Sequence, residues 1–174
     1  LPICIERVDS MRIFGVIVSN TLSCKMHVNN IVEKVNRSFY ALKTLRAHGL
    51  DGQALWDVTR ATVVAQLLYA SPAWWGFLKA DDKSKLQSLL TKAQRYGYLP
   101  YKFDTLDTLC ESFDQTLFHS TMYNTKHVLH QLLPPPKETG YNLRHRSHNL
   151  TIPSGVTTTM KQNFINRKLF DDIY

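Results

Sequence analysis

The sequence predicts a mainly α-helical fold: a short N-terminal β-hairpin, a bundle of about five helices, and an irregular, partly helical C-terminal tail. Three observations predict this class. Apolar residues recur every three or four positions from about Ser23 onward, which is the period of an amphipathic helix. Residues 3–6 alternate instead, as in a strand. The run Pro134–Pro136 ends the last bundle helix, because proline has no backbone N–H to donate.

The predicted hairpin lies within residues 3–18. Asp9 and Ser10 supply turn chemistry, and the apolar run from Phe14 to Val18 forms the second strand. A single two-stranded hairpin is only marginally stable in water. We therefore expect it to pack against the helices that follow, or against a sheet that is missing from this chain.

Three longer helices follow, and capping residues and helix breakers set their bounds. The first is apolar along one face for about 20 residues and ends at His48–Gly49. The second begins at a cap formed by Asp51 and stops at Ser71–Pro72. The third begins at Asp81–Asp82, whose charge suits a helix N-terminus, and ends near Gly97.

Two further helices and a tail complete the expected fold. Asp104 or Thr105 caps a short fourth helix, and Asp114 begins a fifth that continues until Pro134. Beyond the prolines the chain is polar and rich in threonine, with a last amphipathic stretch at residues 164–170. The chain therefore divides into a terminal hairpin (1–22), a helical bundle (23–133) and a basic tail (134–174).

The composition is that of a basic globular protein. The chain has 21 Lys and Arg residues against 14 Asp and Glu, a net charge of +7, and 44% apolar residues, which excludes wholesale disorder. Three widely spaced cysteines are too few for a disulfide scaffold and are typical of a reduced intracellular protein. Because the sequence opens on Leu1 inside a predicted strand, we expect it to be a fragment.

Basic residues concentrate in the first predicted helix and in the tail. The region from Lys25 to Arg46 holds five cations and a single acid, and in the tail Arg144 and Arg146 lie close to Tyr141. Lysine and arginine beside aromatic residues suit a phosphate backbone, because they release its condensed counterions. The same surplus also suits an ordinary solvated face, since helical spacing spreads the cations of the first helix around its polar side.

Catalytic and metal-binding motifs are sparse. The chain has no Gly-rich phosphate loop and no hydrolase signature. The pairs His127/His130, His145/His148 and Cys24/His27 have metal-ligand spacing, but they fall in different elements, and we interpret them as surface or boundary residues. Asp81–Asp82 could hold a metal ion only beside a third carboxylate. A helix start follows the pair, so we interpret it as helix-capping.

One long stretch lacks charge. No charged residue occurs between Arg60 and Lys79, a gap of 18 positions that approaches the length of a membrane helix. The step Ser71–Pro72 interrupts it. We therefore predict a buried core helix followed by an aromatic turn, and no membrane span.

Several short stretches occur in a recognisable order. They are Phe14–Val16 (FGV) with Leu22, His27 and Ile31; Leu68–Gly76 (LYASPAWWG); Arg95–Tyr98 (RYGY); Tyr141–His148 (YNLRHRSH); and Asn163–Phe170 (NFINRKLF). In this order they resemble the C-terminal, thumb and post-thumb region of the reverse transcriptase of non-LTR (LINE-type, jockey-like) retrotransposons. The resemblance covers nearly the whole chain.

The resemblance implies a role in binding nucleic acid. The hairpin would end the palm domain, and the following helices would form the thumb that grips an RNA template and DNA primer. The polymerase carboxylates of the family would lie upstream, on the missing palm and fingers. The parent would thus be an RNA-directed DNA polymerase that uses Mg²⁺, whereas we expect this chain to hold no cofactor and to be inactive alone. The implied contacts are Lys34, Arg37 and Lys43 of the thumb, with Arg144 and Arg146 of the tail.

The implied location is intracellular, in a nuclear or cytoplasmic ribonucleoprotein. The alternative is a structural helical module that binds proteins, a domesticated or decayed remnant of such an element. In that case the run Trp74–Phe77 forms an exposed protein-facing patch. If the run instead fills the core, the patch does not exist.

Overall fold

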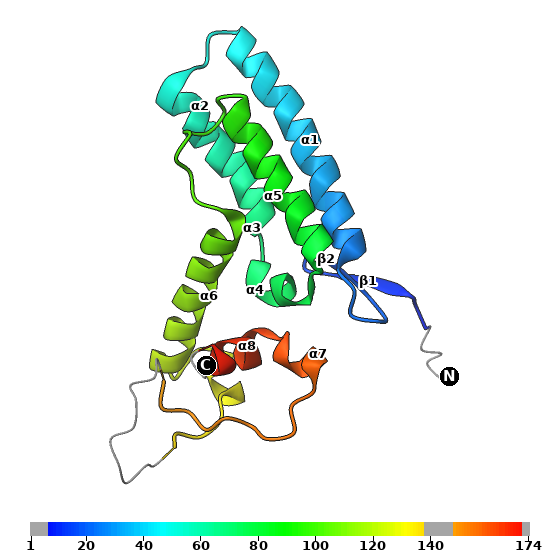
Figure 1. Cartoon of the computed structure of the whole chain (residues 1–174), viewed down its shortest axis with the longest axis vertical. Coiled ribbons are helices and arrows are strands. Elements are labelled where there is room, and N and C mark those ends of the chain that lie inside the picture. The colour runs from blue at the N-terminus through cyan, green and yellow to red at the C-terminus, as the bar shows by residue number, and fades with distance from the viewer. Residues whose placement is uncertain (1–6, 138–147, 172–174) are drawn as a thin grey trace.

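The computed structural model describes residues 7–137 and 148–171 and shows a mainly helical chain with a hairpin at its N-terminal end (Figure 1). Strand β1 (Ser10–Ile13) pairs antiparallel with β2 (Val16–Ser19). Phe14 and Gly15 form the turn between them, with φ angles of 45° and 88°. A two-residue hairpin turn of this kind needs positive φ at both positions, which glycine adopts without strain.

The turn predicted at Asp9 and Ser10 is wrong. Ser10 begins β1 and pairs with Ser19. Asp9 accepts hydrogen bonds from the backbone and side-chain nitrogens of Asn20, at 2.8 and 3.2 Å. Asp9 therefore closes the open end of the hairpin, opposite its turn. The strand predicted at residues 3–6 lies outside the described residues.

Three helical runs form a bundle above the hairpin (Figure 1). Helix α1 (Lys25–Ala47) ends as predicted at His48, and Gly49 follows with a φ of 92°. Asp51 occupies the predicted N-cap position of the second run. That run comprises α2 (Gly52–Thr59), the π-helical segment η1 (Arg60–Val64) and α3 (Ala65–Leu68).

The predicted break at Ser71–Pro72 is confirmed. The second run ends at Leu68, and Ala70 adopts a left-handed φ of 52°. Two short turns follow, α4 (Ser71–Trp74) and η2 (Trp75–Phe77). Proline is tolerated in the first turn of α4, because the first N–H groups of a helix have no partner within it.

The third run, α5 (Ala80–Arg95), completes the bundle. Asp81 and Asp82 lie in its first turn, as predicted, and Gly97 follows its end with a φ of 71°. Helix α5 runs parallel to α1. Near their starts, Nζ of Lys85 lies 3.3 Å from Oδ1 of Asn29, and near their ends Arg46 reaches the carbonyl oxygen of Tyr96.

The fourth and fifth predicted helices are a single helix, α6 (Leu106–Tyr123). Thr105 caps it, as one of the two predicted candidates, by accepting a hydrogen bond from the backbone nitrogen of Thr108 at 3.3 Å. The helix start predicted at Asp114 is wrong. Asp114 lies within α6, where it is buried and paired with Arg167. An internal aspartate is tolerated there because the guanidinium compensates its charge.

The predicted continuation of this helix to Pro134 is also wrong. Helix α6 ends at Tyr123, and only the short 3₁₀ turn η3 (His130–Leu132) precedes the prolines. The tail then folds back towards α6 through α7 (Thr158–Lys161) and α8 (Phe164–Phe170) (Figure 1). Helix α8 is the amphipathic stretch predicted at residues 164–170.

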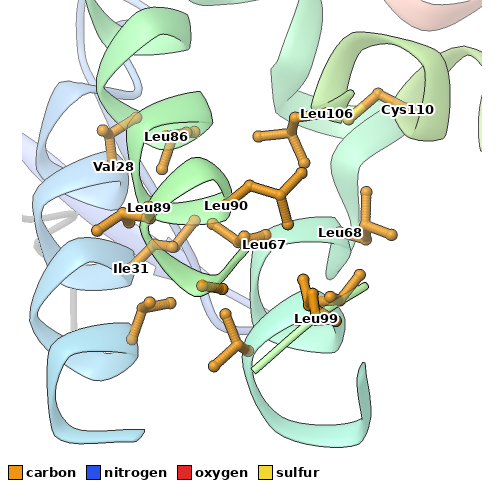
Figure 2. Packing of buried hydrophobic residues seen from close by; sticks show 14 of the residues in the cluster. Val28, Ile31, Leu67, Leu68, Leu86, Leu89, Leu90, Leu99, Leu106 and Cys110 are labelled. Atoms are coloured by element: carbon orange, nitrogen blue, oxygen red, sulfur yellow. The ribbon is translucent and has the colours of Figure 1, made fainter. Parts of the chain in front are cut away.

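The apolar core lies between the bundle helices and extends to the start of α6 (Figure 2). The facing residues are aliphatic and almost fully buried, and they include Val28, Ile31, Leu67, Leu86, Leu90 and Leu106. Much of the uncharged stretch between Arg60 and Lys79 contributes to this core. Among the described residues, no helix combines the length and the apolar character needed to cross a bilayer.

The segment Leu68–Gly76 connects the hairpin, the bundle and the tail. The hydroxyl of Tyr69 donates to the carbonyl oxygen of Phe14 in the hairpin turn at 2.9 Å, and Nε1 of Trp74 donates to the carbonyl oxygen of Tyr69 at 2.9 Å. A Cβ atom on Gly76 would overlap Nη1 of Arg167, so only glycine allows this approach of the tail.

The tryptophans of this segment are core residues. Trp74 is fully buried, Trp75 is nearly so, and their ring centroids lie 5.9 Å apart in an edge-on arrangement. The exposed protein-facing patch of the alternative hypothesis is therefore wrong. Indole rings remove a large apolar area from water when they are buried, which explains why the two tryptophans lie in the core and not on the surface.

Candidate nucleic-acid interface

The three cations predicted on the first helix are exposed on α1, but they do not share one face. Lys34 and Lys43 are nine residues apart, which places them about half a revolution apart around the helix. Arg37 lies nearer to Lys34 and forms an exposed ion pair with Glu33 at 3.8 Å. A single ligand strand lying along α1 therefore reaches either Lys43 or Lys34, not both. Arg144 and Arg146 lie outside the described residues.

Helix α5 brings further cations to the Lys43 side of α1. Nζ of Lys92 lies 5.2 Å from the centroid of the Phe39 ring, which fixes α5 beside that edge of α1. Lys43 follows Phe39 by four residues, so it stands one turn further along the same edge. Lys43 therefore lies on the side of α1 that faces Lys92 of α5.

The ends of the two helices add two arginines. Arg46 donates from Nη1 to the carbonyl oxygen of Tyr96 at 2.6 Å, and its guanidinium carbon lies 4.8 Å from the Tyr98 ring centroid. Arg95 is exposed in the last turn of α5. We call Lys43, Arg46, Lys92 and Arg95 the basic seam. Two of its members pack on aromatic rings, which holds their long side chains in place.

An open groove runs along the outer side of α5 and shares part of the basic seam. Its volume is about 690 Å³. Three cations line it, Lys83, Lys92 and Arg95, together with one acid, Asp107, the ring of Tyr96 and the polar side chains of Ser84, Gln87, Ser88 and Thr91. Such a lining suits a polar, negatively charged ligand better than an apolar one.

Charge is separated between the two sides of the molecule. Helix α1 carries five cations and one acid, and α5 carries four cations with both of its acids in the first turn. Helix α6 is acidic instead, but Arg167 and Lys168 of α8 reach Asp114 and Glu111, each at 2.5 Å. Two of the three acids of α6 are therefore paired with the tail, and the third, Asp107, lies 3.6 Å from Nζ of Lys83 on α5. The five cations of α1 are exposed, as are Lys85 and Arg95 of α5, whereas Lys83 and Lys92 are half-buried.

Sequence reasoning missed the cations of α5. A signal was present, because no acid occurs between Asp82 and Asp104 while four cations fall within α5. The run of cations in α5 lies beside the cations of α1 only because the two helices pack in parallel. That packing joins residues more than 50 positions apart, such as Lys85 and Asn29.

The carboxylates and histidines considered as metal ligands have structural positions. Asp81 and Asp82 lie at the N-terminus of α5, where negative charge is favourable. His130 is hydrogen-bonded through Nδ1 to the carbonyl oxygen of Thr121, and His148 through Nε2 to that of Leu169. In the described part of the chain, no three His, Cys, Asp or Glu residues cluster as a metal site would require.

His27 is buried against the edge of Trp74, with ring centroids 5.0 Å apart, and neither of its ring nitrogens has a hydrogen-bond partner among residues 7–137 and 148–171. Burial, together with the charges of Lys34 and Arg12, lowers the pKa of His27. This leaves His27 neutral inside the protein at neutral pH.

We expect His27 to make the protein less stable in acid. An unfolded chain binds the proton at a pKa of about 6.5. The pKa of His27 in the folded protein is lower than this unfolded value. The contribution of His27 to stability is therefore complete above the unfolded pKa and is lost as the pH falls through the folded pKa. Urea unfolding of the wild type at pH 7.5 and 5.5 is expected to show this fall, and His27→Phe is expected to reduce it. Equal losses in both proteins would contradict the assignment to His27.

Comparison with known proteins adds no identification. No protein-family model, no curated protein and no solved structure matches this chain.

Proposed function

We propose that this chain is the nucleic-acid-binding C-terminal part of a LINE-type reverse transcriptase and that its basic seam holds the phosphate backbone of the template–primer. The observation that carries the proposal is the parallel packing of α1 and α5, which aligns Lys43 and Arg46 with Lys92 and Arg95. The ordered motifs that resemble that family support the same assignment.

The chemistry of the seam supports a polymer of phosphates as its ligand. Four cations come from two helices that pack in parallel, and each phosphate that such a cation binds gains free energy by releasing counterions. The charged ends of Arg46 and Lys92 rest on the rings of Tyr98 and Phe39, which limits the freedom of these long side chains before a ligand binds.

Polymer synthesis is assigned to the parent protein. In this proposal the catalytic carboxylates and their Mg²⁺ ions belong to the palm and fingers upstream of Leu1, and the chain itself binds the template–primer without catalysing synthesis. The partners are an RNA template, a DNA primer and the missing palm, inside an intracellular ribonucleoprotein. Lys34, Arg37, Arg144 and Arg146 remain candidate contacts beyond the seam.

Charge reversal of the seam is expected to weaken binding to an RNA–DNA hybrid. The variant Lys43→Glu with Arg95→Glu removes two exposed cations that make no aromatic contact among the described residues. We expect an affinity loss of about tenfold or more at low salt, and a slope of log K against log salt that is smaller by about 2. Fluorescence anisotropy at several salt concentrations measures both quantities.

A matched control separates local contacts from total charge. Lys126→Glu with Lys137→Glu makes the same change in net charge at exposed positions outside α1 and α5. We expect this control to keep most of the affinity and slope. Lys34→Glu with Arg37→Glu tests the opposite edge of α1 in the same way. A wild type that does not bind at low salt, or binds without salt dependence, would refute the proposal.

A further inference from the structure

The ring of Tyr40 is a feature of α1 that phosphate binding leaves unexplained. Its exposed fraction is 76%, although it sits in the middle of a long helix whose opposite face is the core. Arg37 and Lys43 lie three residues before and after it, so both are its neighbours on the helix surface. Within the described ranges, none of the aromatic or cation–π pairs includes Tyr40.

Tyr40 stands beside the basic seam. Its neighbour Lys43 occupies the edge of α1 that faces α5, one turn beyond Phe39, over which Lys92 lies. Helices α1 and α5 run side by side (Figure 1). Tyr40 precedes Lys43 by three residues and adjoins it on the surface of α1, so a strand bound by Lys43 is within reach of Tyr40. Glu33, the one acid of α1, is paired with Arg37 and does not cancel the positive charge at Lys43.

We propose that Tyr40 stacks on an unpaired base of the strand whose phosphates the basic seam holds. This inference rests on the proposed function and adds the class of substrate, a single-stranded segment of polynucleotide. Every base has a π face that an exposed aromatic ring can cover, and stacking is insensitive to sequence. In a duplex the faces of the bases are already covered by their neighbours, so an intact duplex offers Tyr40 no partner along its length.

Stacking and phosphate binding differ in their dependence on salt. Phosphate contacts release counterions and set the slope of affinity against salt, whereas stacking of a neutral ring changes affinity without changing that slope. Removing Tyr40 should therefore alter which strands bind well, and removing Lys43 should alter how salt affects all of them.

The experiment compares three labelled probes by fluorescence anisotropy with the full chain: an oligothymidine strand, an abasic strand of the same length, and a blunt RNA–DNA hybrid. The wild type is expected to bind oligothymidine about tenfold more tightly than the abasic strand at the same salt. Tyr40→Ala is expected to abolish this difference with an unchanged salt slope and unchanged binding of the hybrid, and Tyr40→Trp to preserve it.

Controls assign each outcome. Tyr123→Ala removes a similarly exposed ring, at 69%, from the end of α6 and should preserve the difference. Equal binding of oligothymidine and abasic strands by the wild type, or a Tyr40→Ala variant that still discriminates, would overturn the inference while leaving the proposed function intact if binding depends on salt. Failure to bind any probe would overturn both.

Discussion

Replacing Trp74 with alanine is expected to lower the free energy of unfolding by about 4 kcal/mol. The ring is fully buried and contacts His27 on α1 and Trp75 on η2, at centroid distances of 5.0 and 5.9 Å. Alanine would leave a cavity among residues that cannot all move to fill it, because they belong to different helices. For a domain stable by about 5–15 kcal/mol, this loss is a large fraction of the total.

Trp74 also supports the break between α3 and α4. Its Nε1 atom donates to the carbonyl oxygen of Tyr69, the residue whose hydroxyl holds the hairpin turn at Phe14. Loss of the indole is therefore expected to loosen the hairpin as well as the core. Urea unfolding followed by circular dichroism gives the free energy, and Trp74→Phe, which retains an aromatic ring, should cost clearly less than alanine. An alanine variant as stable as the wild type would show that the ring is not a core residue.

Local signals predicted the bundle well. The apolar period of α1, the cap position at Asp51 and the break at Ser71–Pro72 are properties of neighbouring residues, and the structure confirms each of them. The hairpin turn was misplaced because Asp–Ser is common in turns, whereas Phe14 seldom adopts the positive φ that it has beside Gly15.

Long-range partners account for what was missed. Asp114 has the sequence character of a helix cap, and only Arg167, 53 residues later, makes it a buried residue within α6. The basic seam depends in the same way on the packing of α5 on α1, which no local pattern specifies. The sequence alone therefore did not show which of Lys34, Arg37 and Lys43 lies beside the cations of α5, because that depends on which edge of α1 faces α5.

The pair formed by Asp114 and Arg167 connects α6 to the tail through a buried carboxylate. The guanidinium donates from Nε and Nη2 to Oδ2 of Asp114, at 3.2 and 2.5 Å, and also to the carbonyl oxygen of Gln162. Oδ1 of Asp114 is buried and has no hydrogen-bond partner in the described part of the chain. Burial raises the pKa of Asp114, although Arg167 opposes this effect.

Arg167→Ala is therefore expected to destabilise the protein by about 3 kcal/mol or more at pH 7, because it leaves a buried carboxylate without its cation. The apolar double variant Asp114→Leu with Arg167→Met should recover part of the loss, since no carboxylate is then buried at this site without its cation, while the carbonyl oxygen of Gln162 still loses its hydrogen bond from Arg167. Urea unfolding of the wild type and the two variants measures both effects. A double variant less stable than Arg167→Ala would contradict this account.

Lowering the pH should also reduce the loss of stability in Arg167→Ala. The direction follows from the coupling between protonation and folding. Without Arg167 the folded pKa of Asp114 lies still further above its unfolded value of about 3.9. A raised folded pKa contributes stability that is present below the unfolded pKa and lost as the pH rises through the folded pKa. The stability gap between wild type and Arg167→Ala should therefore narrow from pH 7 towards pH 4. The contribution of His27 cancels in that difference, because both proteins contain it. A stability gap that stays constant with pH would mean that ionised Asp114 is not the cause of the destabilisation in Arg167→Ala.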